Sequence, residues 1–187
     1  MNIQAQIDKG WTLFLDRDGV INEENVGSYI TKWDEFVFCK GSLHALKQLN
    51  DLFGRIVVVT NQRGVGKGIM TIEDMKSIHQ NMTGEVLAGG GRIDKVYACT
   101  ALEDNDHNRK PNTGMATQAR EDFPEIDFRR SVMVGNNISD MEFGKRMGMY
   151  TVFLTSVRKP YDLPHDLIDE QFPSLQGWVK TLMAEPV

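Results

Sequence analysis

The sequence predicts an α/β protein in which a parallel sheet carries helices on both faces. Short apolar segments, typical of strands buried on both sides, alternate with segments whose apolar residues recur at helical spacing. Strands that alternate with helices along a chain assemble into a parallel sheet through right-handed crossovers. Since neither an internal repeat nor a linker-like stretch divides the sequence, residues 1–187 are expected to form a single domain.

The strand predictions rest on apolar runs that end at polar or small residues. The first two runs stop at the polar groups Asp16-Arg17-Asp18 and Thr60-Asn61-Gln62, which places both groups at the carboxyl ends of strands. The predicted strands cover residues 11–15, 55–60, 95–98, 131–135 and 150–154, with a short edge strand at 167–170.

Capping residues and glycines bound the predicted helices. Ser42 is expected to cap the first helix, which Gly54 ends, and Thr71 with Asp74 resembles a capping box for the second. Either Ser139 or Asp140 is expected to cap the helix that runs to residue 147. The first two predicted helices cover residues 42–53 and 71–88. Two more are predicted at residues 114–123 and 174–183.

Three connections are too distinctive to be simple turns. Residues 23–40 carry several aromatic side chains and predict a packed loop over one edge of the sheet. Residues 63–68 contain three glycines that could cradle phosphate, but their spacing matches no known phosphate-loop pattern, and a flexible loop is the alternative. Residues 99–113 form a polar loop, and residues 1–10 form a short leader into the first strand.

Composition excludes several classes of function. The chain is 41% hydrophobic and 25% charged, as is usual for a globular protein. A net charge of −5 and a pI near 5.4 argue against nucleic-acid or membrane-surface binding. No apolar run approaches the roughly 20 residues of a membrane span. Two cysteines and a start without a signal-peptide pattern predict a cytoplasmic protein.

Asp16 and Asp18 are the first candidates for chemistry. They follow the first strand, two residues apart, and Gly19 provides a tight turn after them. Ligands of open α/β sheets bind at the carboxyl ends of the strands, and carboxylate oxygens suit Mg²⁺. The pair therefore indicates a site for Mg²⁺ and phosphate, although two acids in such a short motif can also simply begin a solvated turn.

Four motifs in order resemble the haloacid dehalogenase superfamily of phosphatases. They are Phe14-Leu-Asp-Arg-Asp-Gly-Val20, Val59-Thr-Asn-Gln62, Arg109-Lys-Pro111 and Val134-Gly-Asn-Asn-Ile-Ser-Asp140. Within the superfamily, the chain looks like the capless branch that contains heptose-bisphosphate and histidinol-phosphate phosphatases. This resemblance implies a three-layer, Rossmann-like fold without a large cap domain.

The resemblance implies that the chain is an enzyme, a phosphoric monoester hydrolase. Asp16 would be the nucleophile that forms an aspartyl-phosphate, and Asp18 would protonate the leaving oxygen and then take a proton from water. Thr60 and Lys110 would hold the phosphoryl oxygens. These roles agree with the chemistry of phosphoryl transfer, which needs an in-line nucleophile and neutralised charge.

The implied magnesium site uses carboxylates, an amide and a backbone carbonyl. Substrate contacts are expected from residues beside the catalytic groups, with the basic ones meeting a second anionic group or serving as ordinary surface charge. The predicted metal ligands are Asp16, Asp18 through its backbone carbonyl, Asn136 and Asp140; the predicted substrate-binding residues are Asn61, Gln62, Arg63 and Arg109, with Lys67 as a further candidate.

Two departures from the family pattern affect these predictions. The fourth strand usually ends on Gly-Asp but here ends on Gly135-Asn136, so a neutral amide replaces a ligating carboxylate and magnesium affinity should fall. A weakly active or inactive binding protein is therefore one alternative. Many relatives also bind zinc in the loop before the third motif, whereas this chain keeps only Cys99 and His107, and no zinc is expected.

The predicted substrate is a small phosphorylated metabolite. A sugar phosphate or bisphosphate such as heptose 1,7-bisphosphate is the leading prediction, and histidinol phosphate is the alternative. A receiver-like signalling module also places acids, a threonine and a lysine around Mg²⁺, but it does not need Asp18 as a proton donor. We expect a monomer or weak homodimer that binds neither nucleic acid nor membrane.

Overall fold

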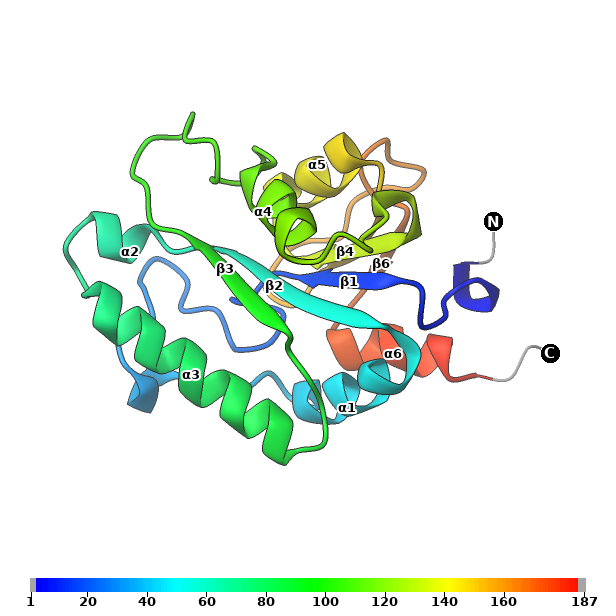
Figure 1. The fold of residues 1–187 in the computed structure, drawn as a ribbon, viewed down its shortest axis with the longest axis horizontal. Helices are drawn as coiled ribbons and strands as arrows, with labels where there is room; N and C mark the ends of the chain where they lie inside the picture. Colours follow the sequence, from blue (N-terminus) through cyan, green and yellow to red (C-terminus); the bar gives the residue numbers. More distant parts are fainter. Residues whose placement is uncertain (1–2, 185–187) are drawn as a thin grey trace.

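The computed structural model describes residues 3–184 and shows a six-stranded sheet in which neighbouring strands are parallel (Figure 1). The strand order is β3-β2-β1-β4-β5-β6, so the chain first builds the sheet on one side of β1 and then on the other. The strands are β1 (Thr12–Leu15), β2 (Arg55–Asn61), β3 (Lys95–Cys99), β4 (Ser131–Gly135), β5 (Tyr150–Leu154) and β6 (Glu170–Phe172).

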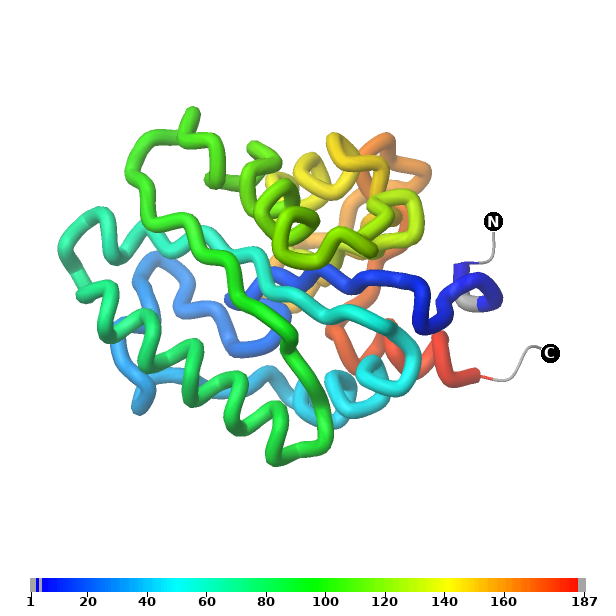
Figure 2. The backbone as a smooth tube through the Cα atoms, in the orientation of Figure 1, coloured from blue at the N-terminus to red at the C-terminus, as the bar shows by residue number. Residues whose placement is uncertain are grey.

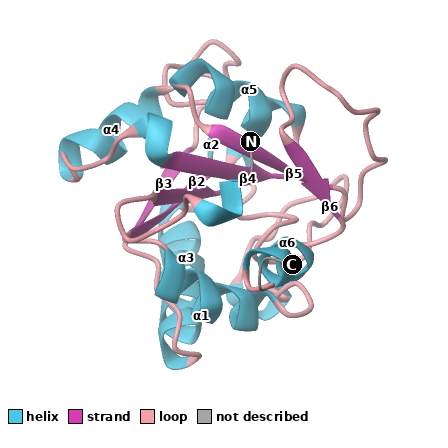
Figure 3. Ribbon diagram, turned by 90° about the vertical axis from the view of Figure 1, so that its right-hand side faces the viewer, coloured by secondary structure: helices cyan, strands magenta, loops and turns pink. Residues whose placement is uncertain are grey.

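Helices cover both faces of the sheet, which confirms the predicted three-layer α/β class (Figure 3). α4 and α5 lie on one face and α1, α3 and α6 on the other, while the short α2 follows β2. None of the helices within residues 3–184 combines the length and apolar character that a membrane span requires. The helices are α1 (Ser42–Leu52), α2 (Arg63–Gly66), α3 (Ile72–Ala88), α4 (Gly114–Asp122), α5 (Ile138–Met147) and α6 (Leu175–Leu182).

The sheet separates two apolar clusters, because successive side chains of a strand point to opposite faces. In β1, Leu13 and Leu15 pack in the cluster shared with α1, α3 and α6, whereas Phe14 packs in the cluster shared with α4 and α5. All three side chains are fully buried. Burial on both faces is what the uninterrupted apolar run of this segment predicts for a central parallel strand.

Two predicted helix caps were wrong, and in each case the loop before the helix supplies the reason. Gly41, with φ of 79°, takes the N-cap position of α1, and the Ser42 hydroxyl instead donates to the carbonyl of Ile21 (2.9 Å). Asn137 precedes α5, and Asp140 serves from the third helical position, where its carboxylate accepts the backbone hydrogen of Asn137 (3.0 Å). The capping box of Thr71 and Asp74 is confirmed.

The predicted edge strand and the predicted flexible loop also differ from the structure. β6 begins at Glu170 instead of residue 167. Just before it, the Asp169 amide donates to the Thr151 carbonyl (3.1 Å), and the Asp169 carboxylate accepts from the Thr151 amide (2.8 Å). Residues 63–66 form α2, one helical turn, instead of an irregular glycine loop.

The loops that follow β1, β2 and β3 gather beyond the carboxyl ends of the strands, at the left of Figure 2. Contacts between distant segments hold them there: Lys67 lies over the ring of Tyr29 (5.3 Å to its centre), and Arg63 pairs with Asp104. In residues 23–40, Trp33 stacks on Phe36 with 4.9 Å between ring centres, which confirms the predicted packed loop. These loops surround the end of β1.

Candidate active site

Asp16 lies directly after β1, where the strand order reverses. Its backbone amide donates to the carbonyl of Val134 on β4 (2.9 Å), so the residue sits between the ends of the two central strands. Connecting loops diverge from such a point in opposite directions and leave a crevice, where ligands of open parallel sheets bind. The topology therefore places Asp16 at the expected binding position.

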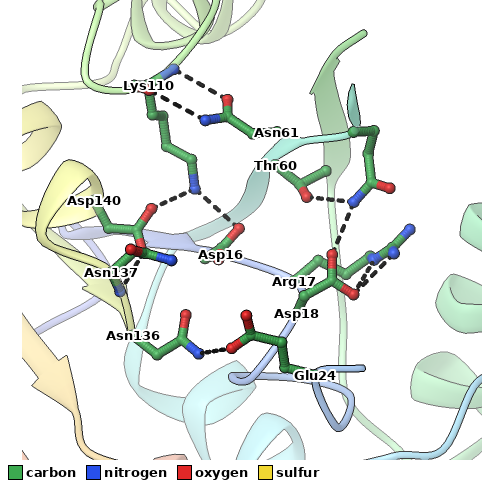
Figure 4. Close-up of polar contacts among 11 residues, drawn as sticks. Asp16, Arg17, Asp18, Glu24, Thr60, Asn61, Lys110, Asn136, Asn137 and Asp140 are labelled. Carbon is green, nitrogen blue, oxygen red and sulfur yellow. Dashed lines mark hydrogen bonds and ion pairs between the residues drawn. The ribbon is translucent and has the colours of Figure 1, made fainter. Parts of the chain in front are cut away.

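Lys110 links Asp16 with Asp140 (Figure 4). Its Nζ lies 2.9 Å from Oδ1 of Asp16 and 2.6 Å from Oδ1 of Asp140, and the side chains of Lys110, Asp16 and Asp140 are 2%, 12% and 1% exposed. Burial raises the pKa of Asp16, Lys110 opposes this, and the neighbouring Asp140 and Asp18 raise it further. Burial would lower the pKa of Lys110, but the two carboxylates outweigh it and raise that pKa. The lysine stays charged, while Asp16 needs a further positive partner to be fully ionised.

Asn61 holds the backbone of Lys110. Its Nδ2 donates to the Lys110 carbonyl (3.1 Å), and its Oδ1 accepts from the Lys110 amide (3.0 Å). Asn61 was predicted to contact substrate, and it lines the cavity described below. Both its amide nitrogen and its amide oxygen already have hydrogen-bond partners in Lys110. The pair of bonds ties the loop after β3 to the end of β2 and directs the lysine side chain toward Asp16.

Asp18 is held in a dense set of hydrogen bonds. Its Oδ1 accepts from Arg17 Nη2 and from Asn22 Nδ2, both at 2.9 Å, and its Oδ2 accepts from Gln62 Nε2 (2.9 Å). Burial raises the pKa of this carboxyl, but Arg17 and the two amides more than offset it, so the pKa is lowered. Gln62 also donates to Oγ1 of Thr60 (2.8 Å), a buried residue that does not line the cavity.

Arg17 is a fully buried arginine between the two acids of the first motif. Its Nη1 lies 3.1 Å from Nε2 of His79 on α3. Burial, followed by the charge of Arg17, lowers the pKa of His79 to about 4. His79 is therefore neutral, and it can accept from Arg17 only with its own proton on Nδ1. Arg17 thus connects Asp18 to a core helix.

Asn136 follows β4 and faces Glu24 from the long loop after β1 (Figure 4). Its Nδ2 donates to Oε2 of Glu24 (2.9 Å), and Arg158 Nη2 donates to Oε1 of the same carboxylate (2.7 Å). The Oδ1 atom of Asn136 is buried and has no hydrogen-bond partner among the described residues. Gly19 makes room for this amide: it has φ of 79°, and a Cβ there would overlap the Asn136 Nδ2 atom.

Asp140 supports the site from the first turn of α5. One carboxylate oxygen contacts Lys110 and the other accepts the backbone hydrogen of Asn137 (3.0 Å), so both oxygens have partners within the protein. Gly135 permits this close approach, because a Cβ at that position would overlap the Asp140 side chain. The geometry favours Asp140 as an anchor for Lys110 over its predicted role as a metal ligand.

These groups line a small cavity of about 170 Å³. Four carboxylates and two cationic side chains border it, so an anion meets net negative charge unless a cation is also bound. The lining residues include Asp16, Arg17, Asp18, Glu24, Tyr29, Asn61, Gln62, Lys110, Asn136, Asn137, Ser139 and Asp140.

Two predicted substrate-binding arginines do not line this cavity. Arg63 pairs with Asp104 and donates to the Leu102 carbonyl (2.7 Å), while Nε of Arg109 lies 3.2 Å from the same Asp104 carboxylate. The structure brings both arginines together at the loop after β3. Their charges are partly neutralised by Asp104, and their part in substrate binding stays a prediction.

In the loop for which no zinc is expected, the two candidate ligands lie in different surroundings. Cys99 is buried at the end of β3 with its Sγ 3.5 Å from Oδ1 of Asp106, whereas His107 is exposed. Within residues 3–184 no three His, Cys, Asp or Glu side chains are arranged to hold a metal ion.

Sequence reasoning missed several residues that shape the site. Arg17 was visible as the basic residue between the two acids of the first motif, directly after an apolar strand. Glu24, His79 and Arg158 carried no comparable signal, because each belongs to a segment far along the chain from the group it contacts. Glu24 and Asn136, for example, are 112 residues apart in sequence.

Comparison with known proteins identifies the family. A family model described as polynucleotide kinase 3 phosphatase matches residues 12–168. A D-glycero-alpha-D-manno-heptose-1,7-bisphosphate 7-phosphatase of Mycobacterium bovis is 34% identical over 166 residues, covering 88% of this chain and 87% of the relative. The chain belongs to the haloacid dehalogenase superfamily. It is a phosphatase, a phosphoric monoester hydrolase, which confirms the prediction made from the four motifs.

Other members of the haloacid dehalogenase superfamily match over similar lengths. A D-glycero-beta-D-manno-heptose-1,7-bisphosphate 7-phosphatase of Helicobacter pylori is 31% identical over 171 residues, covering 90% of this chain and 96% of the relative. The fold matches the crystal structure of D,D-heptose 1,7-bisphosphate phosphatase from B. bronchiseptica complexed with magnesium and phosphate, with a TM-score of 0.80 and 22% identity. That match covers 92% of this chain and 97% of the other.

Proposed function

We propose that this phosphatase hydrolyses a sugar bisphosphate, heptose 1,7-bisphosphate or a close analogue, with Mg²⁺ and through an aspartyl-phosphate on Asp16. The observation that carries the proposal is the placement of Asp16 at the strand-order reversal, in a cavity that also holds the Lys110 ammonium and the unpartnered Oδ1 of Asn136. Relatives named for this substrate match nearly the whole chain.

The residues present fit a magnesium ion. Asn136 Oδ1 is a buried oxygen without a partner among the described residues, and Mg²⁺ takes oxygen ligands. The excess of carboxylates around the cavity also calls for a cation before an anionic substrate binds. Asp16, Asn136 and the backbone carbonyl of Asp18 would hold the ion. When bound, it would lower the pKa of Asp16 and reduce the repulsion between this carboxylate and the phosphate.

In the first step, a carboxylate oxygen of Asp16 attacks the phosphorus, and the bond from phosphorus to the sugar oxygen breaks. Lys110 neutralises charge on the phosphoryl oxygens while Asp140 and Asn61 keep it in place. The sugar oxygen takes a proton from Asp18. In the second step, water attacks the aspartyl-phosphate, Asp18 takes the proton of that water, and the Asp16 carboxylate returns with release of phosphate.

Asp18 begins this cycle as a carboxylate, because Arg17 and two amides lower its pKa. We propose that it takes up its first proton when a phosphate group enters the cavity, since adjacent negative charge raises the pKa of a carboxyl. The hydrogen bond from Gln62 to Oδ2 holds the group ready beside the cavity. Asp18 would then serve as acid in one step and base in the next.

The sugar would lie outside the small cavity, against the loops around it. The cavity that Asp16 borders measures about 170 Å³, and the proposal places the transferring phosphoryl group and the ion in it. Tyr29 and Asn25, from the loop after β1, border the cavity, and in this proposal they contact the sugar. Relatives are named for both the alpha and the beta anomer, so the anomer that this chain prefers is a question for measurement.

Phosphate release across a substrate panel tests the proposal. The panel contains both anomers of heptose 1,7-bisphosphate, other sugar phosphates and bisphosphates, and histidinol phosphate, each with Mg²⁺ and with EDTA. We expect the heptose bisphosphates to give the highest kcat/KM, EDTA to stop the reaction, and Asp16→Asn to abolish it. Preference for histidinol phosphate would overturn the substrate assignment, and undiminished release by Asp16→Asn would remove Asp16 from the role of nucleophile.

A further inference from the structure

The contact between Glu24 and Asn136 fixes which way the Asn136 amide faces. An ionised carboxylate only accepts hydrogen bonds, so the Asn136 nitrogen must turn toward Oε2 of Glu24, 2.9 Å away. The oxygen then lies at the opposite end of the amide, where Figure 4 shows it on the side of Asp16 and Asp140. The contact with Glu24 therefore favours this orientation over the flipped one, in which Oδ1 would face Glu24 and Nδ2 the cavity.

Arg158 fixes Glu24 in turn. Its Nη2 donates to Oε1 at 2.7 Å, so the two oxygens of Glu24 serve two different donors. The Glu24 side chain is 21% exposed and Arg158 is 35% exposed, which places the pair at the edge of the cavity. Both residues come from loops, after β1 and after β5, that meet beside the end of β4.

We propose that Glu24 is a positioning residue that makes Asn136 a metal ligand, because it holds the amide with Oδ1 toward the cavity. The inference rests on the proposed binding of Mg²⁺. It explains how a chain with an amide at the end of β4 retains an oriented oxygen there. In this proposal Glu24 acts through Asn136 and is not itself a metal ligand.

The inference predicts that Glu24→Gln weakens Mg²⁺ binding when residue 136 is asparagine but not when it is aspartate. In Glu24→Gln, the Arg158 donor takes the single oxygen of the new amide, which leaves its nitrogen facing residue 136. Asn136 must then present Oδ1 to that nitrogen and turn Nδ2 toward the metal position, where a donor repels a cation. An aspartate at position 136 has two equivalent oxygens, so it can accept from the introduced glutamine with one and bind the ion with the other.

The test is calorimetric titration of Mg²⁺ into metal-free protein, without substrate, for the parent, Glu24→Gln, Asn136→Asp and the double variant. Glu23→Gln is the matched control, because it removes the same charge from the adjacent, exposed residue. We expect Glu24→Gln to weaken binding by about 10- to 100-fold, the usual effect of losing a residue that orients a metal ligand. The double variant should bind at least as tightly as the parent, and the control should change affinity less than about twofold.

The outcomes separate this inference from the proposed function. If the parent does not bind Mg²⁺, the proposed metal dependence fails and the inference fails with it. If the parent binds but Glu24→Gln matches the Glu23→Gln control, the inference alone is wrong. Equal weakening by Glu24→Gln in the parent and in the Asn136→Asp variant would also overturn it, because a general loss of charge or folding would not depend on which residue stands at position 136. Far-ultraviolet circular dichroism checks that each variant is folded.

Discussion

Replacing Lys110 by methionine should destabilise the protein by about 3–5 kcal/mol, the usual cost of removing one partner from a buried ion pair. Lys110 is 2% exposed and lies between Asp16 and Asp140, at 2.9 and 2.6 Å. Methionine preserves much of the packing of the aliphatic chain but leaves two buried carboxylates side by side. For a protein of this size, each kcal/mol corresponds to about 2–4 °C in Tm, so we expect a drop of roughly 6–20 °C.

The chain offers a matched control for this experiment. Lys95 pairs with Asp122 at 2.6 Å, the same distance as one of the Lys110 contacts, but the two side chains are 46% and 38% exposed. Water already solvates and screens such a pair, so Lys95→Met should cost less than about 1 kcal/mol. Urea unfolding of the parent and both variants, followed by circular dichroism, measures the difference.

The cost of Lys110→Met should also depend on pH. Without the lysine, no positive charge offsets the burial and the neighbouring carboxylates that raise the pKa of Asp16, so the folded variant binds more protons than its unfolded chain above about pH 4. Its stability therefore falls as the pH rises, and the deficit relative to the parent should be larger at pH 8 than at pH 5. Equal losses for Lys110→Met and Lys95→Met at pH 8 would refute the view that a buried ion pair organises the site.

Three further predictions concern Asp18, His79 and the loop after β3. Asp18→Asn should keep the fold and lower phosphate release by about 10²–10⁴-fold, measured in single-turnover assays, and a smaller loss would contradict its acid–base role. Burial and Arg17 lower the pKa of His79 from 6.5 to about 4. The free energy of unfolding should therefore decrease as the pH falls from 6.5 to 4, by up to about 1.4 kcal/mol per pH unit. In urea titrations, His79→Gln should remove this pH dependence. Elemental analysis should find no stoichiometric zinc; one zinc per chain that disappears in Cys99→Ser would show that this loop binds metal after all.

The positions of Asp16 and Lys110 could be anticipated because both belong to local patterns. Asp16 ends an apolar strand, and a residue after a central strand of a parallel sheet must lie at the carboxyl edge. Lys110 belongs to the third of the four short motifs on which the family resemblance rests. The contact of Lys110 with Asp140 could not be anticipated, because it depends on how the loop after β3 folds back, and Asn61 provides the two hydrogen bonds that direct it.

The substrate contacts were the least predictable part of the site. Arg63 and Arg109 carry charge beside the motifs, and charge alone indicated anion binding. The structure shows both paired with Asp104, an acid from the loop after β3, and their part in substrate binding stays a prediction. A sequence shows that such residues are charged but not which opposite charge lies nearby, because an exposed loop can follow many paths with little difference in apolar burial.

The amino-acid sequence by itself determined the α/β class, the strands and the edge of the sheet where the chemistry lies. Apolar periodicity is a local property, because the order of apolar and polar residues within one strand or helix indicates which of its faces is buried. The tertiary structure alone decided that Asn136 meets Glu24, that Asp140 pairs with Lys110 and that Arg17 reaches His79. Each of these contacts joins segments that are brought together by the packing of the sheet and its loops, and hydrogen bonds between such segments depend on distances of tenths of an ångström that no local pattern encodes.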